Sequence, residues 1–183
     1  MEEIESLVIT AADTNVPLAE RLGAFGKIVM RFQDMAYGCA YAILGDFHLA
    51  EDVAQEAFLT AYRQLPKLRR PQAFPGWFRR IVLSQCRRLT RRKSLSTTAL
   101  DAAAAVPASV PAPPQNLERR ETKDKVLAAI AALPEHQRMA TTLFYINGYS
   151  QKDVADFLEV PLTTVKKRLA DSRIKLKKRM IAM

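Results

Sequence analysis

Several residue types that mark whole classes of protein are scarce in this chain of 183 residues. It has two cysteines, Cys39 and Cys86, and no CxxC pair, so neither a structural zinc site nor a disulfide framework is indicated. We expect both thiols to be buried and reduced, as suits a reducing cytoplasm. The longest apolar run, residues 126–133, is far shorter than the roughly 20 residues that span a bilayer. The acidic N-terminus is unlike the basic start of a secretory signal. The sequence thus predicts a cytoplasmic protein without membrane contact.

Signatures of catalysis are missing as well. The two histidines, His48 and His136, are far apart and have no motif around either, and we interpret them as surface or capping residues. No GxGxxG, GxxxxGK or GxSxG pattern occurs in the chain. We therefore predict that the protein is not an enzyme and needs neither a metal nor a cofactor.

Charge is plentiful but unevenly placed. The chain has 28 Lys and Arg against 19 Asp and Glu, a net charge of +9. Residues 1–59 have three basic and ten acidic side chains, a net of −7, whereas residues 60–93 have eleven basic side chains and no carboxylate. Residues 94–117 have a net charge of −1, and residues 118–183 have +6. Two separate basic blocks indicate that the protein binds a polyanion and contacts it in two places.

A proline-rich stretch divides the chain. Residues 94–115 contain four prolines and a single charge, so we interpret them as a flexible spacer with little to bury. The predicted organisation is an acidic N-terminal tail or short helix at 1–20, a domain at 21–93, a linker at 94–117 and a domain at 118–183.

Apolar residues on both sides of the linker recur at spacings of three and four, and no segment sustains a period of two. The fold class is therefore predicted to be all-α, with two small helical domains. The expected helices are Phe25–Leu44, Leu49–Leu65, Phe74–Lys93, Leu117–Ala132, Glu135–Ile146, Ser150–Leu158 and Leu162–Met180.

The last two of these helices have the pattern of a helix-turn-helix. Ser150 is placed to cap the amide of Asp153, and the break at 159–161 separates a short helix from one rich in Lys and Arg. The second helix is the one that would enter a major groove, with its first residues at base edges and later basic residues at phosphates. The residues expected to face inward are Val154, Ala155, Phe157, Leu158, Val165, Leu169, Ile174 and Leu176.

The helix expected at 49–65 divides into two faces at about 100° per residue. One face is polar and suits docking onto a basic or polar protein surface: Asp52, Gln55, Glu56, Leu59 and Arg63. The other face is apolar and is expected to pack inward: Val53, Ala54, Ala57, Phe58, Ala61 and Leu65.

Aromatic and arginine residues are interleaved in the first basic block. Rings on which bases stack, next to cations that follow the backbone, suit single-stranded or opened nucleic acid. Phe74, Trp77 and Phe78 are the rings concerned, and we expect at least one of them to belong to the core instead.

Five motifs in this order resemble a known family. They are AEDVAQEAFL at 50–59, Phe74-x-x-Trp77 opening an Arg-rich helix, LPEHQR at 133–138, Gly148-Tyr-Ser150, and VPLTTVKKRL at 160–169. The chain is similar to bacterial RNA polymerase sigma factors of the sigma-70 family, extracytoplasmic-function type, over about residues 21–181. The resemblance implies a protein that binds core polymerase, directs it to a promoter and helps to open the duplex.

The resemblance implies three surfaces. The first docks on the clamp helices of the polymerase beta-prime subunit and comprises Asp52, Gln55, Glu56, Leu59 and Arg63. The second reads and melts the minus-10 element, captures a flipped base in the 68–73 loop, and comprises Arg69, Arg70, Phe74, Trp77, Arg79, Arg80, Ser84, Arg87, Arg88 and Arg91. The third reads the minus-35 element as a duplex and comprises Thr163, Thr164, Lys166, Lys167, Arg168 and Arg173. The beta flap is a further implied partner. Anti-sigma proteins often hold such factors inactive, which this sequence neither shows nor excludes.

Some positions depart from the family pattern, so no promoter consensus is carried over. Leu83 and Ser84 stand where Arg-Asn is common, Arg88 where Asp is common, and Thr163 where Gly is frequent. Asp171 either reads a cytosine amino group or faces away from DNA. Two other hypotheses stay open on the residues alone: a stand-alone helix-turn-helix regulator and a basic helical RNA-binding protein. The first does not need the Trp-plus-Arg segment, and the second does not explain the helix-turn-helix.

Overall fold

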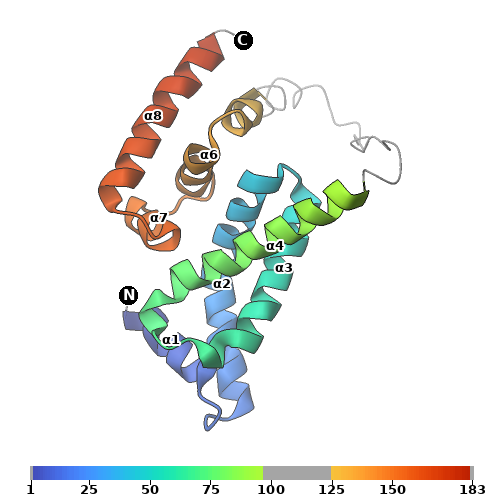
Figure 1. The fold of residues 1–183 in the computed structure, drawn as a ribbon. Helices are drawn as coiled ribbons and strands as arrows, with labels where there is room; N and C mark the ends of the chain where they lie inside the picture. The colour runs from blue at the N-terminus through green and yellow to red at the C-terminus, as the bar shows by residue number, and fades with distance from the viewer. Residues whose placement is uncertain (1, 97–124, 182–183) are drawn as a thin grey trace, which may run out of the picture.

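The computed structural model describes residues 2–96 and 125–181, with the side chains of residues 2 and 93–96 excepted, and every element in these ranges is helical (Figure 1). This confirms the predicted all-α fold. The first domain contains α1 (Glu2–Ala12), α2 (Leu18–Leu44), α3 (Phe47–Gln64) and α4 (Phe74–Ser96). Two short 3-10 turns, η1 (Leu65–Lys67) and η2 (Pro71–Ala73), connect α3 to α4.

The helix pair α2 and α3 begins and ends where local chemistry requires. Gly45 ends α2 in the left-handed region, with φ of 68°, and its amide donates to the Tyr41 carbonyl. Asp46 then caps α3 by accepting a hydrogen bond from the Leu49 amide at 3.0 Å. The helix α2 starts seven residues before the predicted Phe25, because Gly23 and Gly26 lower helix propensity without ending a helix that packs on its neighbours.

The N-terminal residues predicted as a tail or short helix form α1, which belongs to the first domain. Ile4, Val8 and Ala11 are buried against the core, and Glu3 pairs with Arg31 of α2 at 3.2 Å. Their spacing of four and three residues places all three on one face of α1. The domain therefore begins well before residue 21. The acidic residues of the N-terminus lie on a helix that packs on α2 and on η1 and η2.

The second domain comprises helical residues 125–131, α6 (Glu135–Thr141), the π-helical turn η4 (Thr142–Ile146), α7 (Gln151–Leu158) and α8 (Leu162–Ile181). The single helix predicted for 135–146 is thus two elements. In η4 the Asn147 amide donates to the carbonyl of Thr142, five residues earlier, at 3.0 Å. Half of the predicted helix 117–132 and most of the predicted linker 94–117 lie outside the described residues. Within the described residues, α4 continues to Ser96.

The two domains share one buried cluster. The second domain packs with α6 and η4 against α2, and with α7 against the start of α4 (Figure 1). Cys39 and Cys86 lie in this interior as free thiols, as predicted, and burial raises the pKa of Cys86 to about 11. Both sulfurs therefore stay protonated and unreactive at neutral pH.

Two absences hold for residues 2–96 and 125–181. None of their helices has the length and apolar character that crossing a membrane demands. No group of three or more His, Cys, Asp or Glu residues in these ranges is arranged to hold a metal ion.

Candidate functional site

The polar face predicted for α3 is exposed as expected. Asp52, Gln55 and Arg63 are exposed, Glu56 is half-buried, and Leu59 leaves 52% of its surface open to solvent. The opposite face is buried in full, and its members are Val53, Ala54, Ala57, Phe58, Ala61 and Leu65. The two faces share no residue. The helix can therefore present its acidic stripe, formed by Asp52, Gln55 and Glu56, without loss of packing.

The acidic stripe borders a groove between α3 and α4. Asp52, Gln55, Glu56 and Leu59 line one wall of the groove, and Gln85, Arg88 and Leu89 line the other. The sequence assigned Arg88 to the minus-10 surface. In the structure Arg88 is exposed and lines this groove together with Asp52 and Glu56.

The three aromatic residues at the start of α4 separate into two groups. Phe74 and Phe78 are completely buried, and their rings stack with centroids 5.6 Å apart. Phe32 of α2 packs edge-on against Phe74 at 5.2 Å, and Phe58 of α3 lies 4.6 Å from Phe78. Phe74 thus offers no surface to a base, and its predicted DNA contact is wrong for this arrangement of the domain. It joins α2 to α4.

Trp77 keeps the exposure that the aromatic prediction requires. It is half-buried and lines a second groove between α3 and α4 together with Arg80, Ser84 and Gln85. Gln85 donates to the hydroxyl of Thr60 across this groove at 3.2 Å. Three residues of the predicted minus-10 set therefore lie together, namely Trp77, Arg80 and Ser84.

The other basic residues predicted for the minus-10 element lie at three places. Arg69 and Arg70 are exposed in the loop between η1 and η2, and Arg87 and Arg91 are exposed on α4. Arg79 is half-buried and donates to the Leu158 carbonyl of α7 at 3.1 Å. The exposed arginines form a field that suits phosphate binding, whereas Arg79 is already engaged within the chain.

The helix-turn-helix forms as the sequence predicted. The Ser150 hydroxyl accepts a hydrogen bond from the Asp153 amide at 3.1 Å and donates to the Asp153 carboxylate at 2.6 Å, which caps α7. The turn after α7 begins at Glu159, the one non-glycine residue with positive φ in the described ranges, at φ 52°. Glycine is the usual residue for this conformation, because a Cβ atom is crowded there.

The helix α8 presents most of the predicted minus-35 residues. Thr163, Lys166, Lys167 and Arg173 are exposed, and Thr164 and Arg168 are half-buried. Burial lowers the pKa of Arg168, and the positive charge of Arg79 lowers it further. Arg168 still carries its charge at neutral pH, because a guanidinium titrates far above that range.

The inward face of α8 differs from the prediction at one position. Val165 and Leu169 are buried, but Ile174 is 58% exposed. Nine residues separate Ile174 from Val165, which at about 100° per residue turns it to the opposite side of the helix. Ser172 occupies the inward position and satisfies its hydroxyl on the Arg168 carbonyl at 2.7 Å. The seven-residue spacing between Val165 and Ser172 already indicated that Ser172 faces inward. A search for apolar residues passes over this position because serine is polar.

Comparison with protein families gives two matches. Residues 28–95 match "Sigma-70 region 2", and residues 123–176 match "Sigma-70, region 4". The first match covers α3, α4 and most of α2, and the second covers the helix-turn-helix.

Curated relatives are similar along most of the chain. The RNA polymerase sigma-H factor of Pseudomonas aeruginosa is 32% identical over 159 residues, which cover 82% of each protein. The ECF RNA polymerase sigma factor SigW of Bacillus subtilis is 29% identical, over 86% of this chain and 89% of that one. A probable RNA polymerase sigma factor of Xanthomonas campestris, RfaY, is 33% identical, and the matched part spans 40% of its length.

Solved structures share the fold. CnrH in complex with the cytosolic domain of CnrY superposes with a TM-score of 0.65 over 98% of both chains, at 24% identity. The sigma factor RpoE of Bartonella quintana, in complex with the anti-sigma factor NepR, superposes with a TM-score of 0.55 over 85% of this chain and 96% of that one, at 18% identity.

Proposed function

The chain belongs to the sigma-70 family of RNA polymerase sigma factors as an extracytoplasmic-function member, and we propose which of its residues carry each part of that function. As such a factor it directs RNA polymerase to promoters through regions 2 and 4. It performs no chemistry of its own, because sigma factors are non-catalytic polymerase subunits. We place it in the bacterial cytoplasm, where its polymerase partner works.

Core polymerase is proposed to dock on α3. The supporting observation is the acidic stripe of Asp52, Gln55 and Glu56, which is accessible beside the exposed Leu59 and Arg63 and borders the groove to α4. A stripe of this kind complements the basic or polar surface expected of the beta-prime clamp helices. Arg88 lies in the same groove, so we assign it to the polymerase contact and not to the minus-10 element.

The minus-10 element is proposed to bind along α4 and the loop before it. Trp77 provides a partly exposed ring next to Arg80 and Ser84, and Arg69, Arg70, Arg87 and Arg91 provide cations for the backbone. Because opened strands bind by stacking and by charge, this set suits a melted non-template strand. Phe74 is left out, since its ring is buried.

The minus-35 element is proposed to bind α8 as a duplex. Thr163, Lys166 and Lys167 are exposed in its first two turns, where a recognition helix meets base edges. Arg168 and Arg173 lie further along and suit phosphates. One observation carries the proposed function. The basic helix α8 follows an α7 that is capped by Ser150, and the acidic docking face lies on the other domain.

Two further partners are proposed for the second domain and for the whole chain. An apolar groove on the second domain, lined among others by Ile130, Tyr145, Leu176 and Met180, suits the polymerase beta flap. An anti-sigma protein is proposed as a regulator, because a sigma factor of the same fold has been solved with one.

Promoter-specific run-off transcription with purified core polymerase tests the function. We expect specific transcripts from a subset of fragments in a genomic promoter library, and none without the protein. Absence of any specific transcript, with competent core and no inhibitor present, would contradict the proposal.

Lys166→Ala is expected to weaken binding of a minus-35 duplex by about 1 to 3 kcal/mol, the usual value of a good base contact. Its physical reason is the loss of a donor at the start of the recognition helix. The measurement is fluorescence anisotropy with a promoter fragment identified by run-off transcription. Lys27→Ala is the matched control, because it removes the same exposed charge from α2. An equal loss in both variants would mean that only net charge matters.

A further inference from the structure

The helix α8 carries one acidic side chain among its many cations. Residues Leu162–Ile181 include eight lysines and arginines and a single carboxylate, that of Asp171. The sequence left two alternatives for this residue, which either reads a cytosine amino group or faces away from DNA. The direction of Asp171 around the helix axis and the partners of its neighbours distinguish between them.

Asp171 does not lie on the packed face of α8. Val165, Leu169 and Ser172 mark that face, since all three are buried. At about 100° per residue, Asp171 is turned about 120° away from Val165 and about 160° away from Leu169 around the helix axis. Its side chain is half-buried, so part of it is open to solvent. The carboxylate therefore points away from the core of the second domain.

The neighbours of Asp171 on this side of α8 are exposed. Lys167 lies about 40° from it and Ile174 about 60° from it around the axis. Lys167 is exposed, and Ile174 leaves 58% of its surface open to solvent. Lys167 belongs to the proposed minus-35 surface. Asp171 is thus on the side of α8 that is proposed to meet base edges.

The fold provides no partner for the Asp171 carboxylate. Lys167, Arg168 and Lys175 stand three or four positions away, which is the spacing at which helix residues pair. None of them forms an ion pair with Asp171 in the part of the chain that the structure describes. Lys175 donates instead to Oε1 of Gln137 on α6 at 3.0 Å. The carboxylate is left available to a ligand.

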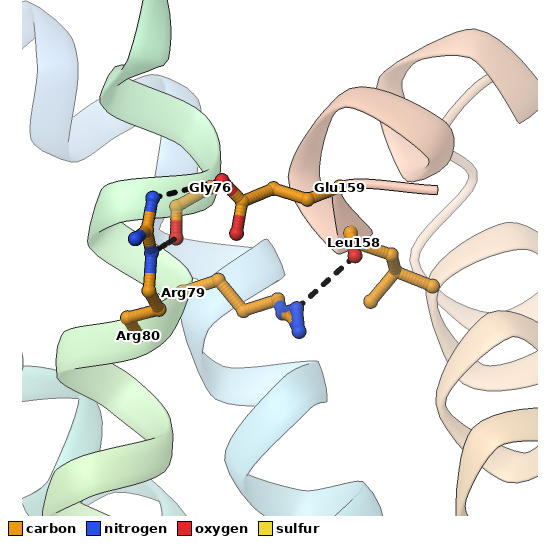
Figure 2. A network of polar contacts seen from close by, with 5 residues as sticks. All are labelled: Gly76, Arg79, Arg80, Leu158 and Glu159. Carbon is orange, nitrogen blue, oxygen red and sulfur yellow. Dashed lines mark hydrogen bonds and ion pairs between the residues drawn. The ribbon is translucent and has the colours of Figure 1, made fainter. Parts of the chain in front are cut away.

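Other carboxylates of the helix-turn-helix are used within the chain. Asp153 accepts a hydrogen bond from the Ser150 hydroxyl at 2.6 Å, and Glu159 pairs with Arg80 at 2.8 Å (Figure 2). Asp171 is the tenth residue of α8, too far from its first turn to cap the helix or to gain from the helix dipole. Aspartate is also a weak helix former. The stability of α8 therefore does not explain this residue.

We propose that Asp171 selects a cytosine in the minus-35 element by accepting a hydrogen bond from the N4 amino group of that base. Cytosine presents only a donor in the major groove, and a carboxylate is only an acceptor. Guanine and thymine present acceptor oxygens there, which a carboxylate repels, and adenine presents an acceptor nitrogen beside its amino group. The inference rests on the proposed function, because it names a base that α8 reads.

Lys167 indicates where the cytosine lies. It precedes Asp171 by about one helical turn, and its ammonium group is a donor that suits guanine O6 and N7. In zinc-finger recognition helices, side chains about one turn apart contact successive base pairs. We therefore expect the cytosine to lie next to the base pair whose preference depends on Lys167.

The test uses holoenzyme reconstituted from the full chain and purified core polymerase. The minus-35 region of a promoter fragment found by run-off transcription is randomised, and the DNA that the holoenzyme binds is sequenced. Asp171→Asn keeps the shape of the side chain, and Asp171→Ala removes it while favouring the helix. Lys167→Ala locates the neighbouring base pair. Glu135→Gln is the matched control, because it removes one negative charge from an exposed position on α6.

We expect the parent protein to prefer cytosine at one position by about five- to thirtyfold. Asp171→Ala should lose the preference at that position alone, and Asp171→Asn should move it to adenine, whose N6 and N7 suit an amide. Both variants should bind an unselected duplex about twofold more tightly, because a charge that repels phosphate is gone. Glu135→Gln should keep the cytosine preference. A purely structural role would change the affinity for all sequences alike.

An unchanged cytosine preference in Asp171→Asn and Asp171→Ala would overturn the inference, as would a parent protein without such a preference. An equal change in Glu135→Gln would assign the effect to net charge and overturn it as well. If no fragment supports transcription, the selection is repeated with the full chain alone on a randomised duplex. A cytosine preference that depends on Asp171 would then support the inference while the proposed function fails.

Discussion

Glu56→Lys is expected to weaken the binding of core RNA polymerase by about 30- to 150-fold, or about 2 to 3 kcal/mol. Glu56 is half-buried in the groove that Asp52, Gln55 and Arg88 share with it. Reversal of its charge would place a cation next to Arg88 and opposite a basic partner surface, and like charges held together without full solvation repel strongly. The measurement is competition with a labelled sigma factor for purified core.

Glu51→Lys is the matched control for this prediction. Glu51 is exposed on the same helix, but at about 100° per residue it lies about 140° away from Glu56 around the helix axis. It changes net charge equally and leaves the groove alone. Affinity of Glu56→Lys for an isolated minus-35 duplex should stay near that of the parent protein. An equal loss of core binding in both variants would show that total charge, and not the face of α3, sets the affinity.

Phe74→Ala is expected to lower the free energy of unfolding of the first domain by about 3 to 5 kcal/mol. The ring has no exposed surface and contacts Phe32 and Phe78, so its removal leaves a cavity where α2 meets α4. Trp77 is the single tryptophan of the chain and its ring lies 5.8 Å from that of Phe74. Urea unfolding followed by Trp77 fluorescence therefore reports on this domain.

Trp77→Ala is the companion variant, followed by circular dichroism because it lacks the fluorophore. Its half-buried ring should cost less stability than Phe74 does, while promoter melting, measured by permanganate reactivity, should fall in proportion to lost stacking. Phe74→Leu fills most of the same cavity and should recover much of the stability. If the Phe74→Ala protein kept the parental stability but failed to melt DNA, the Phe74 ring would have to be assigned to the DNA surface.

Local patterns in the sequence were sufficient for most helices and for the faces of α3. All the positions predicted to face inward are buried, and Ala50 is buried in addition, because a 3.6-residue period sorts a clearly two-sided helix without knowledge of its neighbours. The Ser150 cap was predictable for a similar reason, since the capping hydroxyl and the amide of Asp153 are three residues apart. Where one polar residue interrupted the period, at Ser172, Ile174 was wrongly placed inside.

Assignments that depend on a distant partner were the ones that needed the structure. Whether Phe74, Trp77 or Phe78 faces DNA depends on which ring Phe32 and Phe58 cover, and those residues lie on other helices. Arg88 lines the groove with Asp52 and Glu56 because α3 packs beside α4. The packing of α1 on α2 likewise follows from surface complementarity that no short window of sequence contains.

The sequence by itself determined the helical class, the two-domain order, the acidic and basic faces, and the family whose motifs it carries. Those features rest on interactions within four residues or on charge counts, which the linear chain contains in full. The tertiary structure alone decided which aromatics are core, where the arginines of α4 lie relative to α3 and α7, and that the domains touch. Arg80 and Glu159 are 79 positions apart, and only the folded chain brings their charges to 2.8 Å.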